Sequence, residues 1–293
     1  MKRKAYFTNK FLPYFLLAPQ LIVTLVFFIL PSLAAFKMSF FREDAFGVSK
    51  HFVWFHNYIA LLKDPSYLNA LWVTLIFAIA VTLISMGGAL SLAMALNNVI
   101  KGNRIYKTLL IWPYAVAPAV AGLLMRFLFN PSIGVIAHWL ENIGWHWNYY
   151  LIGPQALLLV IFAASWQQFS YNFVFFLAGL SAIPESIYEA AALDGAGPWQ
   201  RFKSIVFPLI SPTTFYLFVV NIITACFGSF GIVHIVTHGG PAHWTDMLVY
   251  KVYNDGFMGL DLGGSSTQSV MLMLIVTLLT IVQFYYIDRK VHY

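Results

Sequence analysis

The chain has 293 residues, of which 60% are hydrophobic and 10% are charged. Soluble domains carry about 25% charged residues, so this composition excludes an ordinary water-soluble protein and predicts a membrane protein. The net charge of +6 is not accompanied by a basic cluster beside an aromatic platform, so nucleic acid is not an expected partner.

Six apolar runs are long enough to cross a bilayer, which takes about 20 residues in a helix. In chain order they cover residues 14–36, 68–96, 108–129, 155–180, 213–236 and 268–287. The first run is longer than the apolar core of a signal peptide, so we expect an uncleaved helix. Polarity does not alternate along the runs, which excludes a transmembrane barrel. The predicted fold is all-α, with six transmembrane helices in one domain over residues 1–293.

The distribution of Lys and Arg predicts the orientation. Eleven basic residues lie on the side of the two termini, and five lie on the other side. By the positive-inside rule both termini are cytoplasmic, and the basic surface favours anionic membrane lipid as a partner. The eleven are Lys2, Arg3, Lys4, Lys10, Lys101, Arg104, Lys107, Arg201, Lys203, Arg289 and Lys290.

Several chemical signatures are missing from the sequence. No Asp or Glu lies in the middle of a predicted span, whereas proton-driven transporters usually carry such carboxylates. The sequence has no Walker A motif, no H-E-x-x-H and no G-x-S-x-G, so neither a nucleotide site nor a catalytic constellation is indicated. We therefore expect a protein that is not an enzyme, binds no cofactor and takes its energy from elsewhere.

The cytoplasmic loop 181–210, between the fourth and fifth runs, carries the most specific pattern. Pro184 suits the first turn of a helix, and Glu185 complements the positive end of its dipole. Gly195 can adopt the left-handed conformation that ends a helix, and Pro198 prevents the helix from resuming. A second short helix is predicted over 199–207. Composition alone fits an ordinary interfacial helix equally well.

The order of residues in this loop decides between these interpretations. The loop contains Glu189, Ala190, Ala191, Ala192, Leu193, Asp194, Gly195 and Ala196, followed by Phe202, Ile205, Pro208 and Pro212. This order of residues resembles the EAA loop of binding-protein-dependent ABC importer permeases. Phe207 departs from the usual leucine but keeps the apolar bulk. Further stretches along nearly the whole chain, such as Pro113 to Val120 and Gly256 to Leu262, are similar to the sn-glycerol-3-phosphate branch of that family.

The resemblance implies a permease of the type I fold in the bacterial inner membrane, importing sn-glycerol 3-phosphate. The implied partners are a second permease subunit, two cytoplasmic ATPase subunits that bind the ATP, and a periplasmic substrate-binding protein. The short helix would be the coupling helix that docks on an ATPase. Its implied contact residues are Glu189, Ala190, Ala191, Asp194, Gly195 and Ala196.

Polar residues in the fourth and fifth runs are candidates for the substrate path. Hydrogen-bonding groups shielded from lipid suit an anionic polyol, and such residues here are Trp166, Gln168, Tyr171, Asn172, Asn221 and Thr224. Polar residues also gather where transmembrane helices hydrogen-bond to each other, so that role stays open for each of them.

Arg126 and a histidine pair lie near span ends, and neither is predicted to form a site. Arg126 is the one charge within a predicted span; it favours snorkelling to the interface over binding a phosphate. His234 and His238 have a spacing that can hold a metal, but no further ligand completes a site.

Rival functions remain at the level of sequence. Within the family, the cargo would be an oligosaccharide or a glycerophosphodiester. Outside it, the chain would be a secondary carrier or a polytopic membrane enzyme.

Overall fold

The computed structural model describes residues 11–43, 49–97 and 103–286. Several residues used in the predictions lie outside these ranges. They are the basic residues Lys2, Arg3, Lys4, Lys10, Lys101, Arg289 and Lys290, and the end of the sixth predicted span at Ile287. The chain forms two compact units, one of Met1–Leu62 with Val252–Met271, the other of Lys63–Lys251 with Leu272–Tyr293. The single domain over 1–293 stays a prediction.

The first unit contains a long apolar helix and a small hairpin. The helix consists of α1 (Leu12–Thr24), a π-helical turn η1 (Leu25–Ile29) and α2 (Leu30–Met38). It is followed by β1 (Phe41–Glu43), which pairs antiparallel with β2 (Lys50–Phe52), and by α3 (His56–Lys63). A later part of the chain adds η4 (Asn254–Met258) and the start of α15 (Leu262–Tyr286) to this unit. Asn57 secures the hairpin, since its amide donates to the carbonyls of Ser39 and Phe41, each at 2.9 Å.

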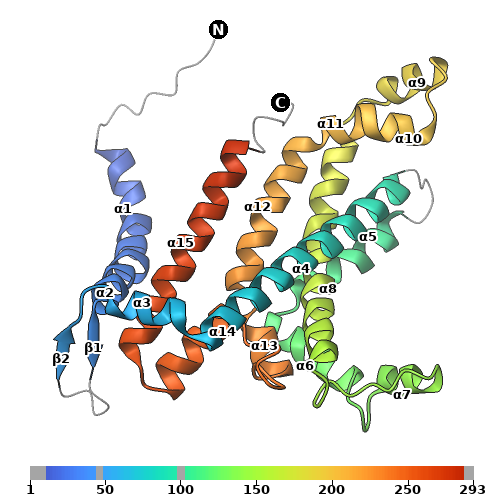
Figure 1. Cartoon of the computed structure of the whole chain (residues 1–293). Helices are drawn as coiled ribbons and strands as arrows, with labels where there is room; N and C mark the ends of the chain where they lie inside the picture. The colour runs from blue at the N-terminus through green and yellow to red at the C-terminus, as the bar shows by residue number, and fades with distance from the viewer. Residues whose placement is uncertain (1–10, 44–48, 98–102, 287–293) are drawn as a thin grey trace. The chain divides into compact units, whose positions relative to one another are not determined.

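The second unit holds the other helices. They are α4 (Pro65–Asn97), α5 (Asn103–Ile111), η2 (Trp112–Ala115), α6 (Pro118–Leu128), α7 (Val135–Asn142), α8 (Gly153–Ser181), α9 (Glu185–Leu193), α10 (Pro198–Arg201), η3 (Phe202–Val206), α11 (Phe207–Leu209), α12 (Ser211–Phe227), α13 (Phe230–Val236) and α14 (Leu248–Tyr253). The long helices α4 and α8 pack together. The short helices α9 to α11 lie at one end of α8, and α7 lies at the other (Figure 1).

Small side chains allow α4 and α8 to approach closely. Ala89 and Ala93 of α4 are fully buried, as is Phe173 of α8. The same core includes Leu217 of α12 and Ile210, which immediately precedes α12. Close packing of small and aromatic side chains is the usual basis of helix association in lipid, where no hydrophobic driving force acts between helices.

The number of spans agrees with the prediction only when bent pairs are counted. Four helices in the described part of the chain are long and apolar enough to cross a membrane: Leu12–Met38, Pro65–Leu96, Gly153–Ser181 and Leu262–Tyr285. The total is six if each of two bent helix pairs is counted as one span. These pairs are Thr108–Ala115 with Pro118–Leu128, and Pro198–Leu209 with Ser211–Phe227.

The third span was predicted as one continuous run over 108–129, and this was wrong. Its two halves meet at 107°. Pro118 has no backbone N–H and disfavours the helical conformation of the residue before it. Accordingly Ala117 is extended, with ψ at 144°. The run is apolar on both sides of this break, so its hydropathy gives no sign of it.

The fifth predicted span, 213–236, is also interrupted. α12 ends at Phe227, and α13 begins at Phe230. Gly228 and Ser229 separate the two helices. A glycine within an apolar run weakens a helix by about 1 kcal/mol relative to alanine, which favours a break at this position.

Candidate functional site

The loop between α8 and α12 contains a short helix with a defined start and end. α9 begins at Glu185, because Pro184 has an extended ψ of 137° and serves as the N-cap rather than as a residue of the first turn. Glu185 lies in the first turn, where its carboxylate interacts favourably with the helix dipole.

The C-terminal end of α9 is a Schellman motif. Gly195 has a φ of +75°, which is the left-handed conformation that glycine adopts without a steric penalty. The Gly195 N–H donates to the carbonyl of Ala192 at 3.1 Å, and the Ala196 N–H donates to that of Ala191 at 3.0 Å. These two bonds satisfy carbonyls that the helix itself leaves unpaired. The prediction that Gly195 ends the helix in a left-handed turn is confirmed.

Most of the predicted coupling residues face away from the rest of the chain. Glu189, Ala190, Asp194 and Gly195 are exposed and Ala196 is half-buried, whereas Ala191 is buried. The exposed face also carries two large apolar side chains, Leu193 at 89% exposure and Trp199 at 74%. Exposed side chains of this size next to acidic groups are typical of an interaction surface.

The loop is firmly attached to the spans. The predicted second helix over 199–207 is longer in the structure, running as α10, η3 and α11 from Pro198 to Leu209. It then turns by 69° into α12. Val206 and Ile210 are buried in the core formed by α4, α8 and α12, so the loop is packed directly against these helices.

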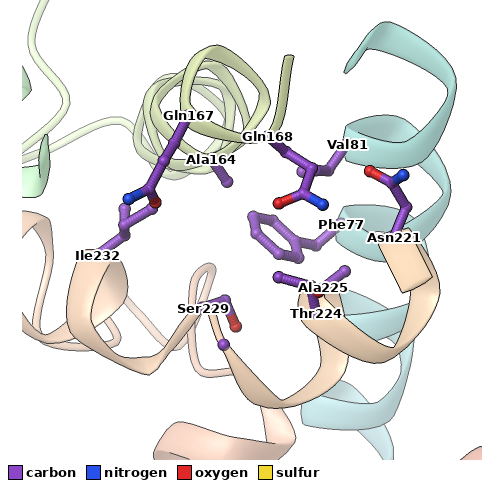
Figure 2. Close-up of a pocket in the computed structure, with 11 residues that line it drawn as sticks. Phe77, Val81, Ala164, Gln167, Gln168, Asn221, Thr224, Ala225, Ser229 and Ile232 are labelled. Atoms are coloured by element: carbon purple, nitrogen blue, oxygen red, sulfur yellow. The ribbon is translucent and has the colours of Figure 1, made fainter. Parts of the chain in front are cut away.

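A small polar cavity lies within the same unit, between α4, α8, α12 and α13 (Figure 2). Its polar walls come from Gln167 and Gln168 of α8, Asn221 and Thr224 of α12, and Ser229. Figure 2 shows the Gln168 amide turned toward Phe77, on the opposite wall. The cavity holds about 30 Å³, enough for a water molecule but not for a substrate.

The cavity contains three of the six predicted substrate-path residues, Gln168, Asn221 and Thr224. Gln167 and Ser229 also line it, although neither was among those six. Gln167 donates to the carbonyl of Val116, which lies at the break of the third span. Irregular backbone at membrane depth is tolerated where it is paired within the protein, and Gln167 provides that pairing.

Asn172 and Asn221 form the centre of a buried hydrogen-bond network. The Asn221 amide donates to Oδ1 of Asn172 at 2.7 Å and to the carbonyl of Leu217 at 2.7 Å. Oδ1 of Asn221 accepts from Asn172 and from the Ser85 hydroxyl, each at 3.1 Å. The network therefore links α4, α8 and α12, and it uses the hydrogen-bonding capacity of Asn221 fully. Ser85 was not predicted, because a serine in an apolar run gives no signal of its own.

Tyr171 and Trp166 belong to separate aromatic groups. The Tyr171 hydroxyl is 2.8 Å from the Tyr216 hydroxyl, and the Tyr171 ring lies 5.5 Å from that of Tyr114. Trp166 packs edge-on against Trp112 at 6.1 Å. These contacts do not border the cavity of Figure 2.

Arg126 is held by the backbone of a neighbouring helix. Its Nη1 donates to the carbonyl of Ile235 at 3.1 Å, so it interacts with the last turn of α13, where a cation is favourable. Burial, His234 and Arg126 together lower the pKa of His238 below its ordinary value. Among the described residues no group of three or more His, Cys, Asp or Glu is placed to hold a metal ion.

Comparison with known proteins identifies the family. Residues 87–293 match the family described as the binding-protein-dependent transport system inner membrane component. This chain belongs to that family. Such a permease is a transport component rather than an enzyme, and its place is the inner membrane, as the apolar helices also indicate.

Relatives of this permease extend the match to the N-terminal region. The sn-glycerol-3-phosphate transport system permease protein UgpA of Brucella abortus is 56% identical over 291 residues, 99% of each chain. UgpA of Yersinia enterocolitica is 50% identical over 287 residues, covering 98% of this chain and 97% of the relative.

Solved structures support the permease fold. A bacterial ABC transporter that imports alginate has a chain with a TM-score of 0.83 and 21% identity, over 95% of this chain and 96% of that one. A chain of the MetNI methionine transporter gives a TM-score of 0.56 at 15% identity, over 81% and 99%. The predicted all-α permease fold is confirmed.

Proposed function

We propose that this permease is one of two membrane-spanning subunits of an ATP-driven importer for sn-glycerol 3-phosphate. The observation that carries the mechanism is the EAA loop, folded as a short helix with a Schellman end and an exposed apolar face. The cargo is supported by the relatives named UgpA, which match this chain along 99% of its length.

The proposed assembly contains a second permease subunit, two ATPase subunits that bind ATP, and a periplasmic binding protein that delivers the substrate. Both termini and the EAA loop face the cytoplasm, in agreement with the excess of basic residues on that side. The EAA loop docks on an ATPase subunit through Leu193 of α9 and Trp199 of α10, with Glu189 and Asp194 offering carboxylates to basic groups. Ala190, Gly195 and Ala196 permit a close approach of backbones, while Ala191 packs inward.

The loop acts as a lever. Closure of the ATPase dimer moves α9, and the buried contacts of Val206 and Ile210 pass this motion to α4, α8 and α12. The permease pair thereby changes between two arrangements that nucleotide biases.

The substrate passes through the region of the cavity of Figure 2, where Gln168 and Thr224 offer hydrogen bonds. Trp166 and Tyr171 border the path on the same helix. Asn172 and Asn221 hold the helices that form it. At about 30 Å³, the cavity must widen for the substrate to pass.

Uptake in proteoliposomes tests this proposal. The full complex, with binding protein outside and ATP inside, is expected to accumulate labelled sn-glycerol 3-phosphate, with competition by unlabelled substrate and not by an oligosaccharide. Uptake of an oligosaccharide or a glycerophosphodiester instead would refute the cargo. Uptake that persists without ATP would refute the ATP-driven mechanism and favour a secondary carrier.

A further inference from the structure

A second cavity lies on the inner side of the EAA loop, away from the face proposed to meet the ATPase. It is open on one side, holds about 370 Å³ and is lined by residues that include Tyr188 of α9, Arg201 of α10, Phe202 of η3 and the ends of α4 and α8 at Met94 and Leu180. Sites for small molecules occupy about 300–1,000 Å³, so this cavity is large enough for a bound group.

Arg201 provides the charge in this cavity. The side chain is half-buried, and its Nε is enclosed without a hydrogen-bond partner among the described residues. No carboxylate in the described part of the chain forms an ion pair with it. A buried donor without an acceptor costs about 1–3 kcal/mol, and more when it is charged. The described part of the chain therefore offers no acceptor for this N–H group.

The residues that line the cavity indicate which chemical class of ligand would pair with Arg201. Apart from Arg201 and the Tyr188 hydroxyl, the residues that line the cavity are apolar. Burial raises the pKa of Tyr188 above its ordinary value, so the hydroxyl remains a donor. Two donors within an apolar wall suit an anion that carries oxygen atoms and an apolar portion, and arginine binds phosphate oxygens well.

The position of the cavity matches the depth of lipid headgroups. α8 ends at Ser181, and α12 begins at Ser211, so the loop between them starts directly where two spans end. Basic pockets at this level bind the phosphate groups of anionic lipids.

We propose that Arg201 binds the phosphate group of an anionic phospholipid in this cavity, with Tyr188 as a second donor, and that the lipid supports the EAA loop from its membrane side. The proposal rests on the proposed function only for the position of the loop at the membrane surface. It concerns bound lipid and not transport, so the two can fail separately.

Mass spectrometry of the intact complex is the direct test. The complex is reconstituted in nanodiscs of phosphatidylcholine with or without phosphatidylglycerol, extracted into detergent and assayed for retained phospholipid. We expect wild type to retain phosphatidylglycerol and Arg201→Gln to bind it at least tenfold more weakly, because a charge-assisted hydrogen bond is lost. Lys203→Gln removes an exposed cation of the same loop and should retain lipid as wild type does.

Further arms separate the alternatives. Arg201→Lys keeps the charge and should show intermediate retention, with the complex eluting as wild type, which excludes misfolding as the cause. Equal retention by wild type and Arg201→Gln would overturn the proposal. The proposal would also be overturned if the Arg201→Gln complex lost its ATPase subunits but retained lipid, because Arg201 would then pair with the ATPase. Arg201-dependent binding of inorganic phosphate in pure phosphatidylcholine, without retained phosphatidylglycerol, would show a free anion and overturn the lipid assignment.

Discussion

Gly195 allows the proposed lever to be tested without disturbing its packing. A Cβ placed on Gly195 would meet no heavy atom within 4 Å. Any effect of a substitution therefore comes from the backbone, which is left-handed with φ at +75°. Alanine, asparagine and valine differ in how well they tolerate that conformation, so they form a graded series at one position.

The expected magnitudes follow from the cost of the left-handed conformation. For an ordinary residue it is about 1–2 kcal/mol, and asparagine tolerates it better than most. A change of that size alters the fraction of correctly turned loops by a factor of about 5–30. Valine should cost the most, since a β-branched residue at positive φ is an outlier. We expect coupled activity to fall in the order glycine, asparagine, alanine, valine.

The assay is ATP hydrolysis stimulated by binding protein, together with ATP-dependent uptake, in reconstituted complexes. The matched control is Gly197→Val, because Gly197 has a φ of −69° and equally open surroundings. Wild-type uptake by Gly195→Val would refute the reasoning, provided that the protein is inserted normally. Equal losses at Gly195 and Gly197 would also refute it, since the effect would not depend on the left-handed turn.

Three further substitutions probe other parts of the second unit. Gln167→Leu removes the donor to the carbonyl at the break of the third span, and we expect a loss of about 1–3 kcal/mol, measured as a lower Tm of the purified complex. Leu193→Ala truncates an exposed apolar side chain and should weaken ATPase retention about tenfold in a pull-down, with Tm unchanged. Gly153→Ala would place a Cβ in collision with the Trp244 ring, and overpacking of this kind costs about 1–3 kcal/mol. Urea or thermal unfolding would measure this loss.

Each of these has an outcome that would contradict it. Gln168→Leu is the control for Gln167→Leu, since it should lower uptake while leaving Tm unchanged; equal Tm values for wild type and Gln167→Leu would remove the structural role of that bond. ATPase retention unaffected by Leu193→Ala would argue against docking through this side chain. Gly197→Ala, which meets no atom within 4 Å, should leave the unfolding transition unchanged, unlike Gly153→Ala.

The sequence predicted the EAA loop well because its determinants are local. The start at Pro184 and the end at Gly195 depend on backbone preferences of single residues. The spans were found from hydropathy, but the breaks before Pro118 and after Phe227 were not. Hydropathy reports the cost of transfer into lipid and carries no information on backbone conformation. The bond from Gln167 that stabilises the first break comes from 51 residues away in the sequence.

The substrate path shows a second limit of prediction from sequence. Gln168 and Asn172 are four residues apart, so they lie on nearly the same face of α8. Helical periodicity therefore predicts the same surroundings for both side chains. In the structure Gln168 lines the cavity, whereas Asn172 is fully buried against Ser85 and Asn221. The difference arises from the helices packed against each residue, which a single sequence does not reveal.

The polar network also constrains how the cavity can open. α8 leads into the EAA loop and α12 leads out of it, so a displacement of the loop acts on both helices. Asn172 and Asn221 join these helices near the cavity, and the core around Ile210 joins them near the loop. We therefore expect α8 and α12 to move as one body. The cavity of about 30 Å³ would then widen through separation of α13 from α4, α8 and α12, rather than through separation of α8 from α12.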